Sequence, residues 1–185
     1  MTTLVSHTYA TPFGPLTVIG TAEDGVVRAS GFRPVADVAA MLPAAYRTAP
    51  VAEGEIPAAS RAVEAWLRGD GSLLGSVPAE QDGGPFHQAA WKALREVPSG
   101  EAVSYQELAM LAGSPRAVRA AGQACARNRL APFVPCHRVV KSGGELGHYG
   151  FGGPDVKRAM LELEGSTEYS TTASSDRERT LAGAR

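Results

Sequence analysis

Residues 78–85 (PAEQDGGP) are the feature that most restricts how this chain can fold. They combine proline, glycine and acidic residues, a composition that ends regular helices and strands and is typical of a linker. We therefore predict two domains, residues 1–80 and 86–165, joined by a linker at 81–85. Residues 166–185 are small, polar and aperiodic, which predicts a disordered tail.

Before the linker, the pattern is that of a small antiparallel sheet with one helix. Short β-like runs at 4–10, 16–21 and 26–32 are separated by turn-forming prolines and glycines. Residues 58–67 (AASRAVEAWL) have the apolar spacing of a helix, and Gly69 supplies its stop.

After the linker, the pattern changes to helices. Apolar residues share one helical face over 86–97. Ser104 and Glu107 form an S-x-x-E capping box, so a second helix should begin at Tyr105 and stop at Gly113. Ser114 and Pro115 are a typical N-cap and first helical residue, which predicts a third helix there and a helix-turn-helix. The fold class is therefore α/β (α+β), an N-terminal antiparallel sheet with a helix followed by a helical domain.

The basic residues are concentrated in the second part of the chain. No Asp or Glu occurs between Glu107 and Glu145, and this interval holds Arg116, Arg119, Arg127, Arg129, Arg138 and Lys141. Such a local basic surface attracts phosphates. Arg116, Arg119 and Arg127 also share one face of the third helix. The alternative is an ordinary solvated face, so this feature alone does not decide for DNA.

The N-terminus and the cysteine count indicate a soluble protein. The first residues lack the basic flank and apolar run of a signal peptide, and no later stretch has the length of a membrane span. We therefore expect a cytoplasmic protein with no membrane partner. Cys125 and Cys136 are the only cysteines, and we expect both to be reduced.

Cys136 is a candidate nucleophile because His137 and Arg138 follow it directly. Nearby cations favour the thiolate, whereas an isolated cysteine is more often a small buried apolar residue. We expect an extended segment here, fixed by Pro132 and Pro135, so His137 would reach the thiol only through a bridging water. His137 is either a base for Cys136 or a solvated surface residue, and if it is a base, a carboxylate should orient it. The downstream candidates, among which the residues alone do not choose, are Glu145, Asp155, Glu162 and Glu164.

Several motifs in order resemble one family. These are G-E-x-x-S-Y at 100–105, R-A-x-G at 119–122, Asn128 eight residues before the cysteine, and V-P-C-H-R-V-V at 134–140. Together they resemble the methylated-DNA–protein-cysteine methyltransferases. The resemblance covers residues 86–165, and the N-terminal part matches only through T-P-x-G-x-L at 11–16.

The resemblance implies a DNA-repair reaction in which Cys136 accepts an alkyl group from O6-alkylguanine in double-stranded DNA, and by extension from O4-alkylthymine. His137 would activate Cys136 through water, with Glu164 behind it, and Asn128 would brace the turn before the cysteine. Tyr105 would press on the 3′ phosphate of the target and aid protonation of the departing base. The reaction would occur once per molecule, without a cofactor and with the nucleotide flipped out of the stack.

The resemblance also implies the residues that would contact DNA and the substrate. Arg119 would replace the extruded guanine in the stack. The implied DNA contacts are Arg119, Tyr105, Ser104, Gly122 and Arg116. The implied pocket residues are Pro135, Val139, Tyr149, Gly150 and Cys125.

The chain departs from the family pattern at three places. Arg129 stands where a proline usually follows the asparagine, Cys125 stands where an apolar residue is usual, and the loop at 149–153 (YGFGG) is one residue longer. With no cysteine before Cys125 and only His7 in the first part, we expect no metal, and we expect a monomer. The competing hypotheses are a DNA-binding regulator, a cysteine hydrolase and a binding-only relative.

Overall fold

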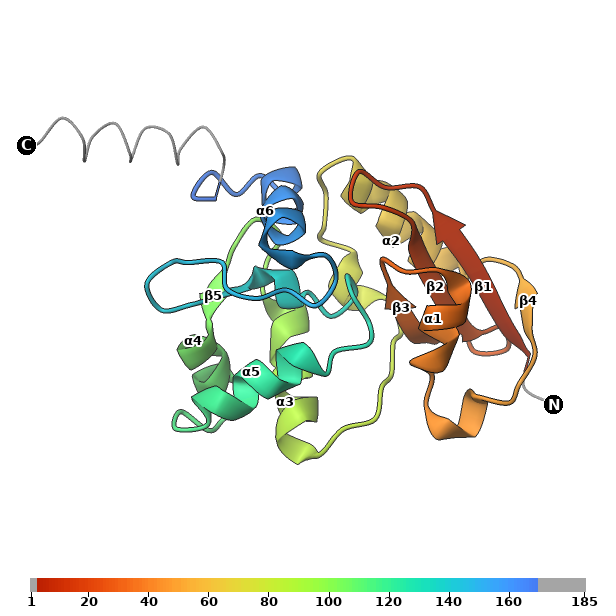
Figure 1. Ribbon diagram of the computed structural model, residues 1–185, viewed down its shortest axis with the longest axis horizontal. Helices are drawn as coiled ribbons and strands as arrows, with labels where there is room; N and C mark the ends of the chain where they lie inside the picture. Colours follow the sequence, from red (N-terminus) through yellow and green to blue (C-terminus); the bar gives the residue numbers. More distant parts are fainter. Residues whose placement is uncertain (1–2, 170–185) are drawn as a thin grey trace, which may run out of the picture.

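The computed structural model describes residues 3–169 and begins with a four-stranded sheet (Figure 1). The first three strands form the antiparallel meander that the sequence predicts. A short fourth strand, which was not predicted, pairs in parallel with the first. The strands are β1 (Leu4–Tyr9), β2 (Leu16–Thr21), β3 (Val27–Gly31) and β4 (Val51–Glu53). Their order across the sheet is β3-β2-β1-β4.

Two helices cover opposite faces of this sheet. The alternation of β2 sends Ile19 toward α1 (Val35–Ala40) and Val18 toward α2 (Pro57–Leu67). The predicted helix at 58–67 is confirmed, and α1 was not predicted. The larger core, on the α2 side, also contains apolar residues from beyond the linker, so it joins both parts of the chain.

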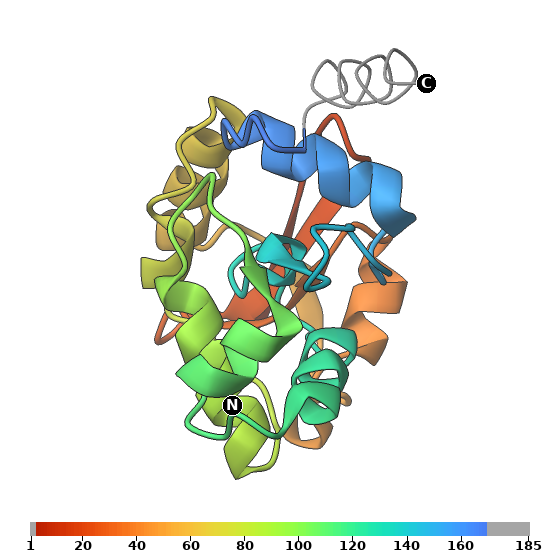
Figure 2. The same cartoon turned by 90° about the vertical axis from the view of Figure 1, so that its left-hand side faces the viewer.

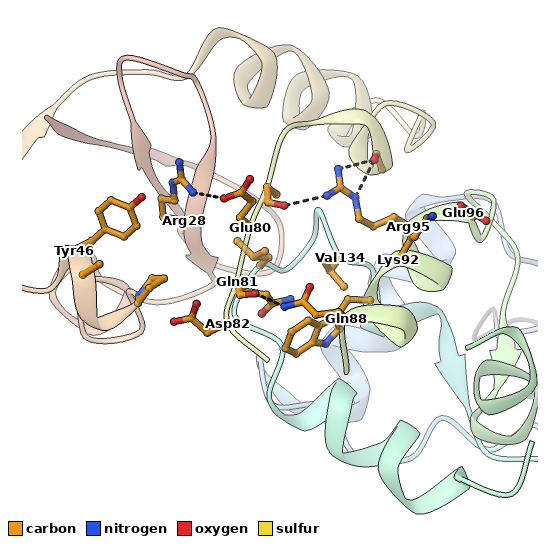
Figure 3. A pocket seen from close by; sticks show the side chains of 16 residues that line it. Arg28, Tyr46, Glu80, Gln81, Asp82, Gln88, Lys92, Arg95, Glu96 and Val134 are labelled. Atoms are coloured by element: carbon orange, nitrogen blue, oxygen red, sulfur yellow. Dashed lines mark hydrogen bonds and ion pairs between the residues drawn. The ribbon is translucent and has the colours of Figure 1, made fainter. Parts of the chain in front are cut away.

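Residues 75–80, which lead into the predicted linker, are hydrogen-bonded to both parts of the protein. On one side, Val27 N donates to Pro78 O (2.8 Å) and Glu80 N donates to Val27 O (3.0 Å). On the other side, the guanidinium of Arg95 donates to the carbonyls of Gly75 and Ala79 (Figure 3). It also donates to the carbonyl of Val77. The division into two domains stays a prediction, but residues 75–80 are held by hydrogen bonds on both sides.

The part after the linker is mainly helical. Its capping box is confirmed, because Glu107 N donates to Ser104 Oγ (3.1 Å) and Ser104 N donates to Glu107 Oε2 (2.6 Å). Helix α4 packs against α3 and α5, and β5 pairs in parallel with β6. The elements are α3 (Pro85–Glu96), β5 (Val103–Ser104), α4 (Tyr105–Leu111), α5 (Val118–Ala126), β6 (Val139–Val140) and α6 (Gly153–Leu163).

The start of α5 differs from the prediction. The helix begins at Val118, and Ser114 is not its N-cap. The reason is a separate turn, in which Ala117 N donates to Ser114 O (2.8 Å) and Ala117 keeps a non-helical backbone (φ −89°, ψ 35°). The connection between α4 and α5 is therefore longer than expected, and the helix-turn-helix assignment stays a prediction.

The chain segment around residues 130–140, teal in both views, runs through the middle of the molecule beneath α6 (Figures 1 and 2). Beyond α6, Ser166 is buried and Tyr169 packs on the cluster of Val140, Leu146 and Leu161. Ser166 and Tyr169 therefore contact the rest of the protein, and the predicted start of the tail at 166 stays a prediction. The rest of the predicted tail, 170–185, lies outside the described residues. Within residues 3–169, no helix has the length and apolar character needed to cross a membrane.

Candidate active site

Cys136 begins a single 3-10 turn, Cys136–Arg138, after Pro135. The prediction of an extended segment is wrong, because Val134 N donates to Leu130 O (2.9 Å) and Arg138 N donates to Pro135 O (2.9 Å). In such a turn successive side chains point about 120° apart. Cys136, 5% exposed, and His137, fully buried, therefore point in different directions.

Asn128 holds the chain that leads to the cysteine. Its Nδ2 donates to Val134 O (2.8 Å) and to the Sγ of Cys136 (3.1 Å). Its Oδ1 accepts from Leu130 N (3.1 Å) and from Gln81 Nε2 (3.0 Å). The side chain is buried and all of its polar atoms are used, so it links the end of α5 to the thiol. This geometry matches the bracing position that the resemblance implies.

His137 and Glu164 form a buried pair. The Nε2 of His137 lies 2.9 Å from Oε1 of Glu164. An ionised carboxylate only accepts hydrogen bonds, so Nε2 carries the proton and Nδ1 keeps its lone pair. Nδ1 has no hydrogen-bond partner among residues 3–169. The imidazole can therefore accept a proton at Nδ1.

The structure selects Glu164 from the acidic residues that the sequence left open. Glu145 pairs with Lys141 (2.8 Å), and Asp155 pairs with Arg158 (3.1 Å). Glu164 makes the bond to Nε2 of the histidine. Sequence spacing alone could not reveal this contact, because Glu164 follows α6 and reaches back across 27 residues.

Arg138 does not belong to the basic surface on which the sequence placed it. It is 2% exposed, and its guanidinium donates to both oxygens of Glu164 (2.8 Å each) and to Val97 O (2.6 Å). Burial would raise the pKa of Glu164, but His137 and then Arg138 outweigh it and hold that pKa far below its usual range. The carboxylate is therefore charged, and Arg138 stabilises that charge from within the protein instead of forming part of a basic surface.

The resting thiol is protonated, contrary to the expectation that its neighbours favour the thiolate. Burial raises the pKa of Cys136, and the hydrogen bond from Asn128 and the charge of Lys157 oppose that rise only in part. Burial likewise lowers the pKa of His137, so the imidazole is neutral. The thiol and the imidazole are therefore both uncharged at rest.

Lys157 is a site residue that the sequence analysis missed. It lies on α6, is fully buried, and donates to Leu146 O (2.6 Å). The available signal was its position one turn before Met160 and Leu161, on the buried face of the helix. Burial lowers its pKa, and the nearby cysteines raise it.

The loop at 147–152 contributes the wall beside the cysteine. Tyr149 and Phe151 are buried, and their ring centroids lie 5.7 Å apart. Arg33 donates to Gly150 O (3.2 Å), and a Cβ on Gly31 would lie 2.7 Å from the ring of Phe151. The loop is therefore docked on the end of β3, so the N-terminal sheet helps to shape this wall.

The remaining predicted pocket residues lie on nearby elements. Pro135 and Val139 flank the 3-10 turn and are buried, and Cys125 on α5 is half-buried. Burial, followed by the nearby Cys136, raises the pKa of Cys125. Tyr105 is half-buried, and burial, with smaller contributions from both cysteines, raises its pKa to about 12.

The predicted DNA-contacting residues lie at the α4–α5 corner. Arg116 and Arg119 are exposed and Gly122 is half-buried, and Ser104 already serves as the cap of α4. The same corner exposes Met110 (56%), Leu111 (60%) and Val118 (38%), which the sequence analysis did not single out.

A separate cavity of about 730 Å³ lies between the linker, α3 and a short 3-10 turn, Ala44–Tyr46 (Figure 3). None of the predicted site residues lines it, although Gln81, one of its wall residues, bonds Asn128. Within the part of the chain that the structure describes, no cluster of three His, Cys, Asp or Glu side chains could hold a metal ion.

Comparison with known proteins places this site in a family. Residues 85–166 match the model of the 6-O-methylguanine DNA methyltransferase DNA-binding domain. A Mycobacterium tuberculosis structure in complex with DNA, named OGT, is 33% identical over 90% of this chain and 96% of that one, with a TM-score of 0.69. The methylated-DNA–protein-cysteine methyltransferase of Methanosarcina acetivorans is 43% identical over 58% of this chain and 68% of its own length.

A third relative is matched over a shorter stretch. The constitutive methylated-DNA–protein-cysteine methyltransferase of Bacillus subtilis is 46% identical over 48% of this chain and 54% of its own length. The match thus spans about half of that relative.

The fold and the site define a class of α/β proteins in which a buried cysteine lies beside a histidine–glutamate pair. Within that class, the chain belongs to the O6-methylguanine DNA methyltransferase family.

Proposed function

We propose that this protein repairs duplex DNA by moving an alkyl group from O6 of guanine to Sγ of Cys136. The observation that carries the proposal is the arrangement of three groups: a thiol held by Asn128, a neutral imidazole, and a charged Glu164 behind it. The named relatives are methyltransferases that act on methylated DNA through a cysteine, which supports the same chemistry here.

In the proposed reaction, the proton of Cys136 passes through a bridging water to Nδ1 of His137. Sγ then attacks the alkyl carbon, the new S–C bond forms as the C–O6 bond breaks, and the electron pair goes to the guanine. Tyr105, whose raised pKa keeps its proton at neutral pH, donates that proton to the departing base. Tyr105 then regains a proton from His137 through solvent, so the proton lost by the thiol balances the one gained by guanine.

The proposed reaction ends after one event. A thioether on Cys136 has no good leaving group, so neither water nor His137 can free the sulfur. A cysteine hydrolase would instead form a thioester, which water can cleave, and would turn over repeatedly. The count of events per molecule therefore separates these two functions.

DNA would reach the site at the α4–α5 corner. The exposed Arg116 and Arg119 supply positive charge there, and small residues such as Gly122 allow a close approach to a DNA groove. An alkylated guanine has its reacting carbon inside the stack, so the nucleotide must flip out before attack. In the proposal Arg119 fills the gap, and Tyr105 presses on the 3′ phosphate. The same pocket would admit O4-alkylthymine.

The test is intact-mass measurement after incubation with excess duplex carrying O6-methylguanine. The expected result is one added methyl on the unmodified protein, none on Cys136→Ala, and an equal loss of the lesion. Cys125→Ala is the matched control, because it removes the other thiol and should still gain one methyl. Repeated turnover would indicate the hydrolase, and duplex binding without any adduct would indicate a regulator or binding-only protein.

A further inference from the structure

Trp66 is a residue of the N-terminal part that reaches the candidate active site. It lies on α2 and is fully buried, and its Nε1 donates to Oε1 of Glu164 (2.9 Å). Its ring centroid lies 6.3 Å from that of His137. Phe13 and Phe32 pack against its ring, with centroids at 5.6 and 6.4 Å. The indole is thus fixed by the N-terminal part while its N–H points at the carboxylate.

We propose that Trp66 is a positioning residue that fixes Glu164, and through it His137, so that the N-terminal part completes the active site. This inference rests on the proposed alkyl transfer. Trp91 shows that a buried indole does not need a carboxylate: its Nε1 donates to the backbone oxygen of Ala124 at the same distance, 2.9 Å. The bond from Trp66 is therefore a specific connection across 98 residues rather than simple satisfaction of a buried donor.

The bond has a chemical consequence because of where it ends. Oε1 of Glu164 accepts from three groups: Trp66, His137 and Arg138. A donor to a carboxylate stabilises its charge and weakens its pull on other protons. Without the indole, Oε1 would hold the proton on Nε2 of His137 more strongly. The pKa of His137 would then rise, so on acidification the histidine would become protonated, and stop acting as a base, at a higher pH.

Other charged groups around the imidazole are left in place by a change at Trp66. These groups are Cys136 and Arg138, which lie on the same 3-10 turn as His137, and Lys157 and Glu164, which lie on α6 and directly after it. Tyr149, on the adjoining loop, also senses the charge of Glu164. A shift in the pH profile after a change at Trp66 alone therefore reports on the bond from the indole.

The experiment measures the single-turnover rate of methyl transfer against pH for the full chain, for Trp66→Phe and for Trp91→Phe. Both variants remove a buried indole and one hydrogen bond of equal length, so they are matched. In the pH–rate profile, the acidic limb is the range in which the rate falls as His137 becomes protonated. In Trp66→Phe we expect this limb to move to higher pH by roughly one unit, so that the rate at a given pH on the limb is about tenfold lower. In Trp91→Phe we expect no shift of the limb.

Incorporation of 5-fluorotryptophan tests the opposite sign without making a cavity. The chain has two tryptophans, so in the Trp91→Phe background only Trp66 carries the label. The fluorinated indole is a stronger N–H donor, so the acidic limb should move down. This measurement decides the matter even if Trp66→Phe does not fold.

The possible outcomes are distinct. Opposite shifts from Trp66→Phe and from the fluorinated indole support the positioning role. The positioning role is overturned if the unmodified protein transfers methyl groups but the acidic limb does not move in the labelled protein. It is also overturned if the acidic limbs of Trp66→Phe and Trp91→Phe lie at the same pH. Absence of transfer by the unmodified protein, with duplex bound, would instead overturn the proposed function.

Discussion

Replacement of Asn128 by alanine should destabilise the protein strongly. The side chain makes four buried hydrogen bonds, two donated and two accepted. Each such bond contributes about 1 kcal/mol net, and buried partners left unsatisfied add to the loss. We therefore expect the free energy of unfolding to fall by about 4 kcal/mol, a large part of the roughly 5–15 kcal/mol typical of a domain.

The assay is equilibrium unfolding in urea, followed by circular dichroism. The midpoint should fall while the slope stays unchanged, because the exposed area on unfolding is the same. Gln88→Ala is the control: this exposed residue donates one side-chain bond, to Gln81 O (2.7 Å), and its loss should cost under about 1 kcal/mol.

The same substitution also removes the N–H that donates to the Sγ of Cys136. The pKa of the thiol should rise further, so its reaction with iodoacetamide at a fixed pH should slow. If Asn128→Ala unfolds at the midpoint of the unmodified protein, or costs no more than Gln88→Ala, the bracing argument is wrong. In that case the backbone from 128 to 136 holds its shape without the side chain.

Three further perturbations test other parts of the structure. Arg119→Ala should slow methyl transfer to duplex DNA, yet change the free energy of unfolding by less than about 0.5 kcal/mol, because the side chain is exposed; a urea midpoint and a transfer rate measured together check this. Gly31→Ala should cost about 1–3 kcal/mol, because the new Cβ would lie 2.7 Å from the ring of Phe151; urea unfolding that matches the unmodified protein would refute the docking of the loop. The free energy of unfolding should decrease as the pH falls below 6.5, by up to about 1.4 kcal/mol per pH unit. The reason is that His137 takes up a proton in the unfolded chain, whereas in the folded protein its burial lowers its pKa and keeps it neutral. A further loss should follow below pH 4.5, the ordinary pKa of Glu164, whose folded pKa is also lowered. Urea midpoints that stay flat from pH 6.5 to 5 would contradict the first sign, and midpoints that stay flat from pH 4.5 to 3 would contradict the second.

Local signals in the sequence were reliable where neighbouring residues decide the structure. The three antiparallel strands follow from alternation and turn residues, and the start of α4 follows from Ser104 and Glu107. The start of α5 was wrong because Pro115 is equally acceptable in a turn. Strand β4 was missed because three residues paired to a distant strand carry no periodic signal.

The site itself was predictable only in part, since its contacts are long-range. The resemblance implies that Asn128 braces the turn before Cys136, and in the structure its amide bonds Val134 O and the thiol. The roles of these residues in a reaction stay a prediction. The sequence placed Arg138 on the surface because charged residues are seldom buried, whereas here the charge of Glu164 compensates its burial. The role of Lys157 was hidden for the same reason.

The carboxylate of Glu164 is held by hydrogen bonds from several distant segments of the chain. Its two oxygens accept from Trp66 on α2, from Gly100 N after α3 (3.4 Å), and from His137 and Arg138 on the 3-10 turn. A group held from so many directions cannot rearrange without local unfolding, and its field is set before any substrate arrives. Such rigidity would suit the proposed single transfer, because no second cycle would require the site to reset. Under the proposed function, the large motion would belong to the DNA, whose damaged base would leave the stack to reach a site that is already assembled.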